Sequence, residues 1–128
     1  MPLYKTSSGT DKQTIHPRTW TPVTFRGEDV IPLAETGWSL YGVMLRIEYP
    51  EKGCPSVLRG RLFRFPGTSR EDVTGFDDKP TWPGDTCHSY WSHFVKGQRG
   101  LVVAFRVWHD GSQPITLDGR QFKWTRLK

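Results

Sequence analysis

Residues 38–49 read WSLYGVMLRIEY, and this stretch carries the clearest strand pattern in the 128-residue chain. Every second residue from Tyr41 to Tyr49 is apolar and falls on one face. Side chains of a strand point alternately to opposite sides of a sheet, so this alternation predicts a long β-strand with one face in a core. The other face carries Leu40, Gly42 and Met44, and an apolar second face predicts a second contact.

Shorter segments with strand-like patterns lie on both sides of this stretch. Turn signals separate them, among them Asp110-Gly111 and Asp118-Gly119, which are typical of tight hairpins. The predicted strands are residues 13–16, 19–27, 38–49, 56–65, 86–95, 101–109, 113–117 and 121–127. Eight short strands without a convincing helix predict an all-β, eight-stranded jelly-roll sandwich of two four-stranded sheets.

Composition and charge narrow the classes of protein. We expect a polar N-terminal arm over residues 1–12 and a single jelly-roll domain over residues 13–128. The net charge of +5 comes from scattered lysines and arginines, which favours a surface complementary to an acidic partner over a specific nucleic-acid site. No secretory signal and no apolar run of roughly 20 residues is present, so we expect a protein made in a cytoplasm without membrane contact.

The apolar second faces of two strands predict a contact with another subunit. Leu40 and Met44 lie on one of these faces, and Leu58 and Leu62 lie on the other. Because a domain of this size has a single core, burial of a second face is most simply explained by a second copy of the chain.

An acidic segment, EDVTGFDDKPTWPGD at residues 71–85, stands out in a basic chain. We predict a long loop whose carboxylates pair with the preceding Arg59, Arg61, Arg64 and Arg70. A weaker alternative is a calcium site built from Asp72, Asp77 and Asp78, although the spacing does not match an EF-hand loop. We therefore predict no cofactor and no firm metal site.

The sequence offers no catalytic arrangement, and we expect that the protein is not an enzyme. His88 and His93 are five residues apart on one predicted strand and so point to opposite faces. No G-x-S-x-G motif is present. Cys54 and Cys87 match no metal motif; we favour free thiols, and whether they pair stays open.

The aromatic residues allow one further class of protein. Trp82 lies in the proline-rich part of the acidic segment, where burial is not assured. With Tyr90 and Trp91 it would make a sugar-stacking platform, so a carbohydrate-binding module is an alternative. Tryptophans of a small sandwich more often belong to its core.

Three segments carry a resemblance to a known group. These are TWTPVTF at residues 19–25, VLRGRLFRFPGTSREDVTGFDD at residues 57–78 and SHFVKGQRGLVVAFRVWHDGSQPITLDGRQFKWTRL at residues 92–127. Over residues 13–127 the chain resembles small jelly-roll domains, similar to the C1q and tumour-necrosis-factor fold, that are virion structural proteins of tailed bacteriophages of actinobacterial hosts.

The resemblance implies a homotrimer within a virion and carries over no catalytic residue. The short chain favours a capsid decoration protein bound to the major capsid protein, and the alternative is a tail or fibre component. In either role we expect Asp77, Asp78 and Trp82 of the acidic segment to meet a neighbouring subunit or partner.

Overall fold

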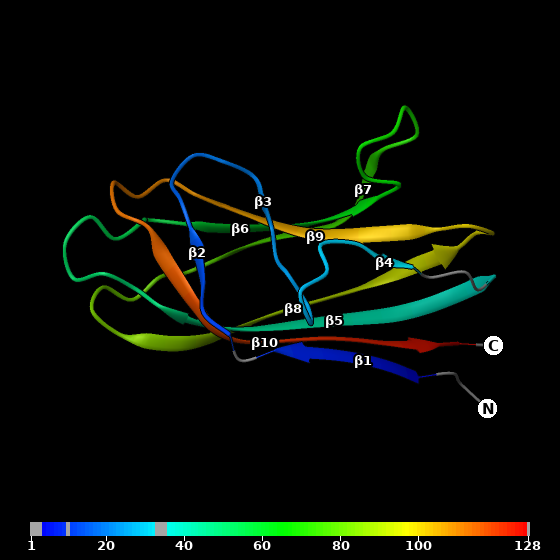
Figure 1. The fold of residues 1–128 in the computed structure, drawn as a ribbon, viewed down its shortest axis with the longest axis horizontal. Coiled ribbons are helices and arrows are strands. Elements are labelled where there is room, and N and C mark those ends of the chain that lie inside the picture. The colour runs from blue at the N-terminus through cyan, green and yellow to red at the C-terminus, as the bar shows by residue number, and fades with distance from the viewer. Residues whose placement is uncertain (1–3, 10, 33–35, 128) are drawn as a thin grey trace.

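The computed structural model describes residues 4–9, 11–32 and 36–127, and within them the chain folds as two antiparallel sheets packed face to face (Figure 1). Sheet A has the order β1-β10-β5-β8, and the short β2 also pairs with β10. Its strands are β1 (Tyr4–Gly9), β2 (Gln13–Ile15), β5 (Gly37–Glu48), β8 (Thr86–Gly97) and β10 (Ile115–Arg126).

Sheet B forms the second layer and has the order β3-β9-β6-β7, with the short β4 also paired to β9. Its strands are β3 (Thr21–Pro22), β4 (Ile31–Pro32), β6 (Leu58–Arg64), β7 (Asp72–Lys79) and β9 (Val102–His109). No helix is present in the described ranges. The all-β sandwich is therefore confirmed, with ten strands in place of the eight predicted.

The core lies between the sheets and consists mainly of aromatic and branched side chains. Tyr41, Val43, Leu45 and Ile47 of β5 point inward as predicted. From β8, Trp91 reaches across the core and meets the ring of Phe105 edge-on, with the ring centroids 5.1 Å apart. Large rings fill the space between two sheets with few residues, which suits a chain of modest hydrophobic content.

The prediction that Leu58 and Leu62 form a subunit contact is wrong. Both side chains have 0% exposure and belong to the core between the sheets. The outward face of β6 carries Arg59, Arg61 and Phe63 instead. Because Phe63 makes this face partly apolar as well, alternation alone does not decide which face of β6 points into the core.

Two segments that we predicted to connect strands are themselves part of strands. The acidic segment is not a loop throughout, because Asp72–Lys79 pairs along β6 as the edge strand β7. Asp118-Gly119 is not a hairpin turn but an irregularity within β10, where the register with β5 shifts between Leu117 and Gly119. A bulge absorbs the additional residue and lets the strand continue.

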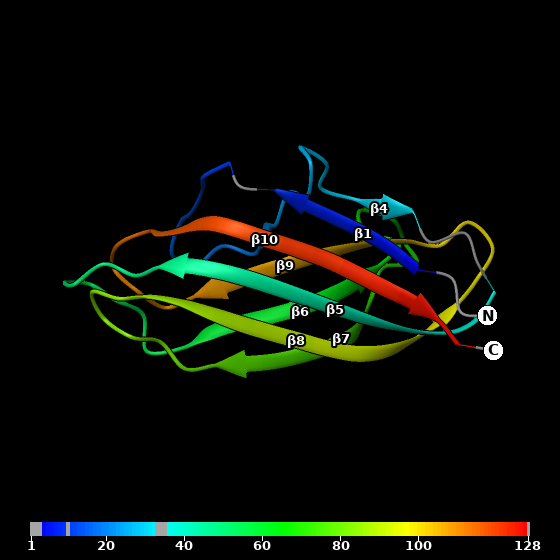
Figure 2. The ribbon, with the colours of Figure 1, turned by 90° about the horizontal axis from the view of Figure 1, so that it is seen from below.

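The expected N-terminal arm is in part a strand. Tyr4–Gly9 pairs along β10 as β1, so this part of residues 1–12 belongs to sheet A. Residues 1–3 and 10 lie outside the described part of the chain. Tyr4 pairs with Thr125, and the two ends of the chain lie at the same end of the sandwich (Figures 1 and 2).

Candidate functional site

The outer face of sheet A carries a group of apolar side chains that are exposed or, for Met44, half-buried. We call it the sheet A patch, and it consists of Trp38, Leu40, Met44, Tyr90 and Phe94. Tyr90 is 65% exposed, Phe94 60% and Trp38 51%. All five residues come from β5 and β8, which run side by side in Figure 2. Large exposed apolar groups that lie together on a soluble protein mark an interaction surface.

Cross-strand pairing holds the patch together. Leu40 lies opposite Phe94, and Met44 lies opposite Tyr90. Between these two pairs, Gly42 faces Ser92, so no bulky side chain fills the middle of the patch. A hollow of about 120 Å³ opens there, lined by Gly42, Val43, Met44, Tyr90, Gln121 and Lys123. The patch is thus an apolar surface with a small concave centre.

The sequence predicted part of this patch. Leu40 and Met44, which we expected to meet another subunit, lie on it. Trp38 and Phe94 were missed, and Tyr90 was assigned to the aromatic platform, although Tyr90 and Phe94 share one face of a predicted strand by simple alternation. The alternation predicts that Tyr90 and Phe94 share a face. That this face adjoins Leu40 and Met44 follows only once β8 is known to pair with β5.

The outer face of sheet B has a different character. We call it the arginine–aromatic face; it consists of Trp20, Arg59, Arg61, Phe63, Phe76, Asp78, Arg106 and Trp108. Arg59 lies over the ring of Trp108 at 5.0 Å, and Arg106 over that of Phe63 at 4.5 Å. Arg61 contacts two rings, Trp20 at 5.4 Å and Phe76 at 5.1 Å. Packing of a guanidinium on an aromatic ring fixes the side chain and adds a favourable electrostatic contact.

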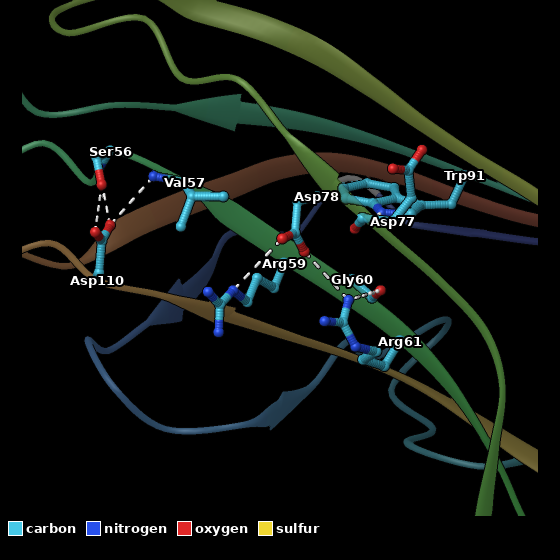
Figure 3. Close-up of polar contacts among 9 residues, drawn as sticks. All are labelled: Ser56, Val57, Arg59, Gly60, Arg61, Asp77, Asp78, Trp91 and Asp110. Carbon is cyan, nitrogen blue, oxygen red and sulfur yellow. Dashed lines mark hydrogen bonds and ion pairs between the residues drawn. The ribbon is translucent and has the colours of Figure 1, made fainter.

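Asp78 lies between two of these arginines (Figure 3). Arg61 Nη1 donates to Asp78 Oδ1 at 3.2 Å, and Arg59 Nε lies 3.6 Å from Asp78 Oδ2. On the next strand, Arg106 Nη1 donates to Glu71 at 3.1 Å. The predicted pairing of the acidic segment with Arg59 and Arg61 is therefore confirmed at Asp78.

The other acidic residues also have partners within the chain. Arg64 holds Asp72 through two hydrogen bonds of 2.7 and 2.5 Å, as predicted, and these bonds lower the pKa of that carboxyl. Asp77 pairs with Lys79 at 2.8 Å, and this hydrogen bond lowers its pKa. Arg70 pairs with no acid in the described ranges; it donates to Gln98 and lies over Phe65.

The weak calcium alternative gains no support from this geometry. Asp72, Asp77 and Asp78 are each engaged by a cation of the chain, and the three belong to different pairings. Within the described part of the chain, no three His, Cys, Asp or Glu side chains come together as a metal-binding group. The same residues contain no helix long and apolar enough to cross a membrane.

The predicted aromatic platform is wrong in one of its three members. Trp91 is 1% exposed, and its Nε1 donates to the backbone oxygen of Asp77 at 3.0 Å (Figure 3). Trp82 is exposed in the connection between β7 and β8, and Tyr90 belongs to the sheet A patch. A carbohydrate platform of Trp82, Tyr90 and Trp91 therefore does not exist.

The remaining candidate side chains, histidines and cysteines, lie in separate surroundings. His88 and His93 point to opposite faces of β8, as expected, with His93 beside Tyr41 at a ring distance of 6.0 Å. Cys54 and Cys87 are free thiols, and both pack against the core cluster. Burial raises the pKa of Cys87, so this thiol is a poor nucleophile.

Comparison with known proteins supports the fold. No family model matches the chain, and no curated protein matches its sequence. Among solved structures it is similar to an Eiger TNF from S. frugiperda, with a TM-score of 0.68 and 8% identity over 98% of this chain and 93% of that one. The globular domain of zebrafish complement 1qA protein gives a TM-score of 0.63, 8% identity and coverage of 98% and 96%.

A third similar structure is murine APRIL at pH 5.0, with a TM-score of 0.58, 15% identity and coverage of 96% of this chain and 100% of that one. Identities this low carry the architecture alone. Sheet order, antiparallel pairing and these likenesses agree on one architecture: the chain has a jelly-roll fold of the C1q and TNF type.

Proposed function

We propose that the chain is a non-enzymatic structural protein that associates as a homotrimer through the sheet A patch and acts as a capsid decoration protein of a tailed-bacteriophage virion. The observation that carries self-association is the exposure of Trp38, Tyr90 and Phe94 side by side on one sheet. The virion assignment rests on the resemblance of residues 13–127 to jelly-roll proteins of phage particles.

Burial of the patch would release a large free energy. Phe94 and Tyr90 are each more than half exposed in the single chain, and covering apolar surface is worth about 25 cal/mol per Å². The concave centre at Gly42 adds a place where a neighbour's side chain can insert. Threefold rather than twofold association rests on the resemblance to trimeric jelly-roll proteins.

The native mass in solution tests self-association, and two phenylalanines of nearly equal exposure provide a matched pair. Phe94 lies on the sheet A patch and is 60% exposed, whereas Phe76 lies on the outer face of sheet B and is 64% exposed. We expect the wild type and Phe76→Asp to sediment as trimers and Phe94→Asp to sediment as a monomer. A wild-type monomer at every concentration, or a Phe94→Asp trimer, would contradict the proposal.

The virion role needs a separate test. Particles from a culture that produces the chain are purified on a density gradient and labelled with an antibody against it. We expect the label on the heads. Label on tails or fibres would support the tail role and contradict decoration. Particles without label would contradict any place of the chain in the virion.

A further inference from the structure

The arginine–aromatic face belongs to the other sheet than the sheet A patch, and Asp78 is its one residue that the sequence predicted to meet a partner. We propose that this face binds an acidic protein surface, whose carboxylates pair with Arg61 and Arg106 while apolar side chains cover Phe76 and Trp20.

The two guanidinium groups keep hydrogen-bonding capacity. In the described part of the chain, every hydrogen bond and ion pair of Arg61 and Arg106 uses Nη1. A guanidinium has five N–H donors in a planar fork that matches a carboxylate. Arg61 and Arg106 are 20% and 23% exposed, so part of each fork can meet an external acid. The aromatic rings against which they pack hold the two guanidinium groups in position.

The pairing of the strands places like charges together. Arg61 lies directly opposite Arg106 across β6 and β9. Two like charges in this position destabilise a sheet unless anions separate them. Asp78 pairs with Arg61 and Glu71 with Arg106, but Asp78 is shared with Arg59, so an additional carboxylate above the pair would be favourable to both.

A protein fits this face better than a nucleic acid or a sulfated polymer. Asp78 and Glu71 lie among the arginines and would repel a chain of dense negative charge. Phe76 is the most exposed ring of the face, and Trp20 lies beside Arg61. Arginine together with aromatic rings is the composition enriched at protein–protein interfaces.

The two proposals are independent, because the faces belong to different sheets. Sheet A is occupied by other copies in the proposed trimer, and the arginine–aromatic face stays open. The monomeric variant Phe94→Asp should therefore bind an acidic partner as well as the wild type does, so failure of one proposal does not imply failure of the other.

The test measures retention of the full chain on an immobilised random copolymer of glutamate and tyrosine, with dextran sulfate as the comparison polymer. We expect Arg61→Gln/Arg106→Gln to lose at least about tenfold in affinity for the copolymer. The matched control is Arg26→Gln/Arg99→Gln, which removes the same charge from two exposed positions outside the face. Its affinity should change by less than about twofold.

Phe76→Ala tests the same face even if Arg61→Gln/Arg106→Gln fails to fold. The ring is 64% exposed, so its removal should leave the fold intact. We expect weaker binding to the copolymer and unchanged binding to polyglutamate, because polyglutamate has no aromatic group to meet the ring.

Three results would overturn the proposal. The first is a wild type that the copolymer does not retain at low ionic strength. Equal losses in the arginine variant and its control would show that net charge alone is responsible. Tighter binding of dextran sulfate than of the copolymer, lost in the arginine variant, would make the face a general polyanion surface.

Discussion

Gly60 shows how strongly a single residue depends on the opposite sheet. A Cβ at this position would lie 2.4 Å from Trp91 Nε1 and 2.7 Å from Phe105 Cζ. Trp91 comes from sheet A and donates a hydrogen bond to Asp77 of sheet B, so its ring has little freedom to move away. Gly60 therefore makes room for one of the largest buried side chains of the core.

Gly60→Ala should destabilise the fold by about 1–3 kcal/mol, because overpacking forces buried rings from their positions. Urea unfolding measures the effect. Gly42→Ala is the matched control, because its added Cβ would meet only Trp91 O, at 3.9 Å. Since Gly42 lies in the sheet A patch, both glycine variants are made in the Phe94→Asp background, in which association does not contribute to stability. Equal stabilities of the two variants would show that Trp91 does not need the space above Gly60.

His109 is a buried titratable group with a defined protonation state. Its Nε2 lies 2.9 Å from Ile15 O, and Gly111 N–H donates to its Nδ1 at 3.2 Å. Because Nδ1 accepts a hydrogen bond, the ring is neutral with its proton on Nε2. Burial lowers the pKa of His109, and the bond to Ile15 and the charge of Asp110 oppose this without reversing it.

A lowered pKa in the folded state means that the unfolded chain binds the proton more tightly. The contribution of neutral His109 to the stability of the folded state is complete above the unfolded pKa of about 6.5. It is lost progressively as the pH falls below that value. We expect the unfolding free energy to fall between pH 7 and pH 5.5 by at most about 1.4 kcal/mol per pH unit. His109→Gln should remove this slope, and a slope unchanged by the substitution would contradict the assignment.

At the scale of elements, one carboxylate joins two connections at the same end of sheet B. Asp110, after β9, accepts hydrogen bonds from Ser56 N at 2.8 Å and Val57 N at 3.2 Å, and from the Ser56 hydroxyl (Figure 3). The bonds fix the start of β6 beside the end of β9. The sequence predicted a tight turn at Asp110-Gly111 but not this long-range contact.

Asp110→Ala should cost about 1–3 kcal/mol, because two backbone N–H groups lose their acceptor. Asp110→Asn keeps one oxygen in place and should cost less. Thermal unfolding of the two variants gives the comparison. If both variants unfold with the wild type, solvent satisfies these groups and the contact does not hold the two connections together.

The edge strand β7 was missed in the sequence for a physical reason. β7 contains Asp72, Asp77 and Asp78, residue types that are depleted from strands, and it forms because it lies at an edge where β6 supplies arginines opposite. Asp118-Gly119 is a turn signal that depends on two adjacent residues. β10 continues past it because both flanking parts pair with β5, which is distant in the sequence. Local patterns predict long central strands well and edges poorly.

At the scale of the whole molecule, self-association should link stability to concentration. Unfolding of a trimer releases separate chains, so its midpoint temperature rises with protein concentration by mass action. We expect this rise for the wild type and for Phe76→Asp, and none for Phe94→Asp. Calorimetry over a hundredfold range of concentration checks it; a concentration-independent wild type would mean that the sheet A patch remains uncovered.

The architecture could be predicted from the sequence because the alternation in residues 38–49 and 101–109 defines two core strands without reference to the rest of the chain. The faces could be predicted only in part. Leu40 and Leu58 have the same apolar signature, yet one is exposed and the other is fully buried. Which face of β6 points inward depends on its neighbours in sheet B, and no local pattern contains that information.

The pairing of Tyr4 with Thr125 has a consequence for engineering. Since β1 begins beside the end of β10, a short flexible linker should join the two strands without disturbing either sheet (Figure 2). New termini opened in the exposed connection between β8 and β9, at Arg99-Gly100, would then yield a circular permutant with every strand retained. A protein fused to such a permutant would project from the connection between β8 and β9, and not from the strand ends at Tyr4 and Thr125.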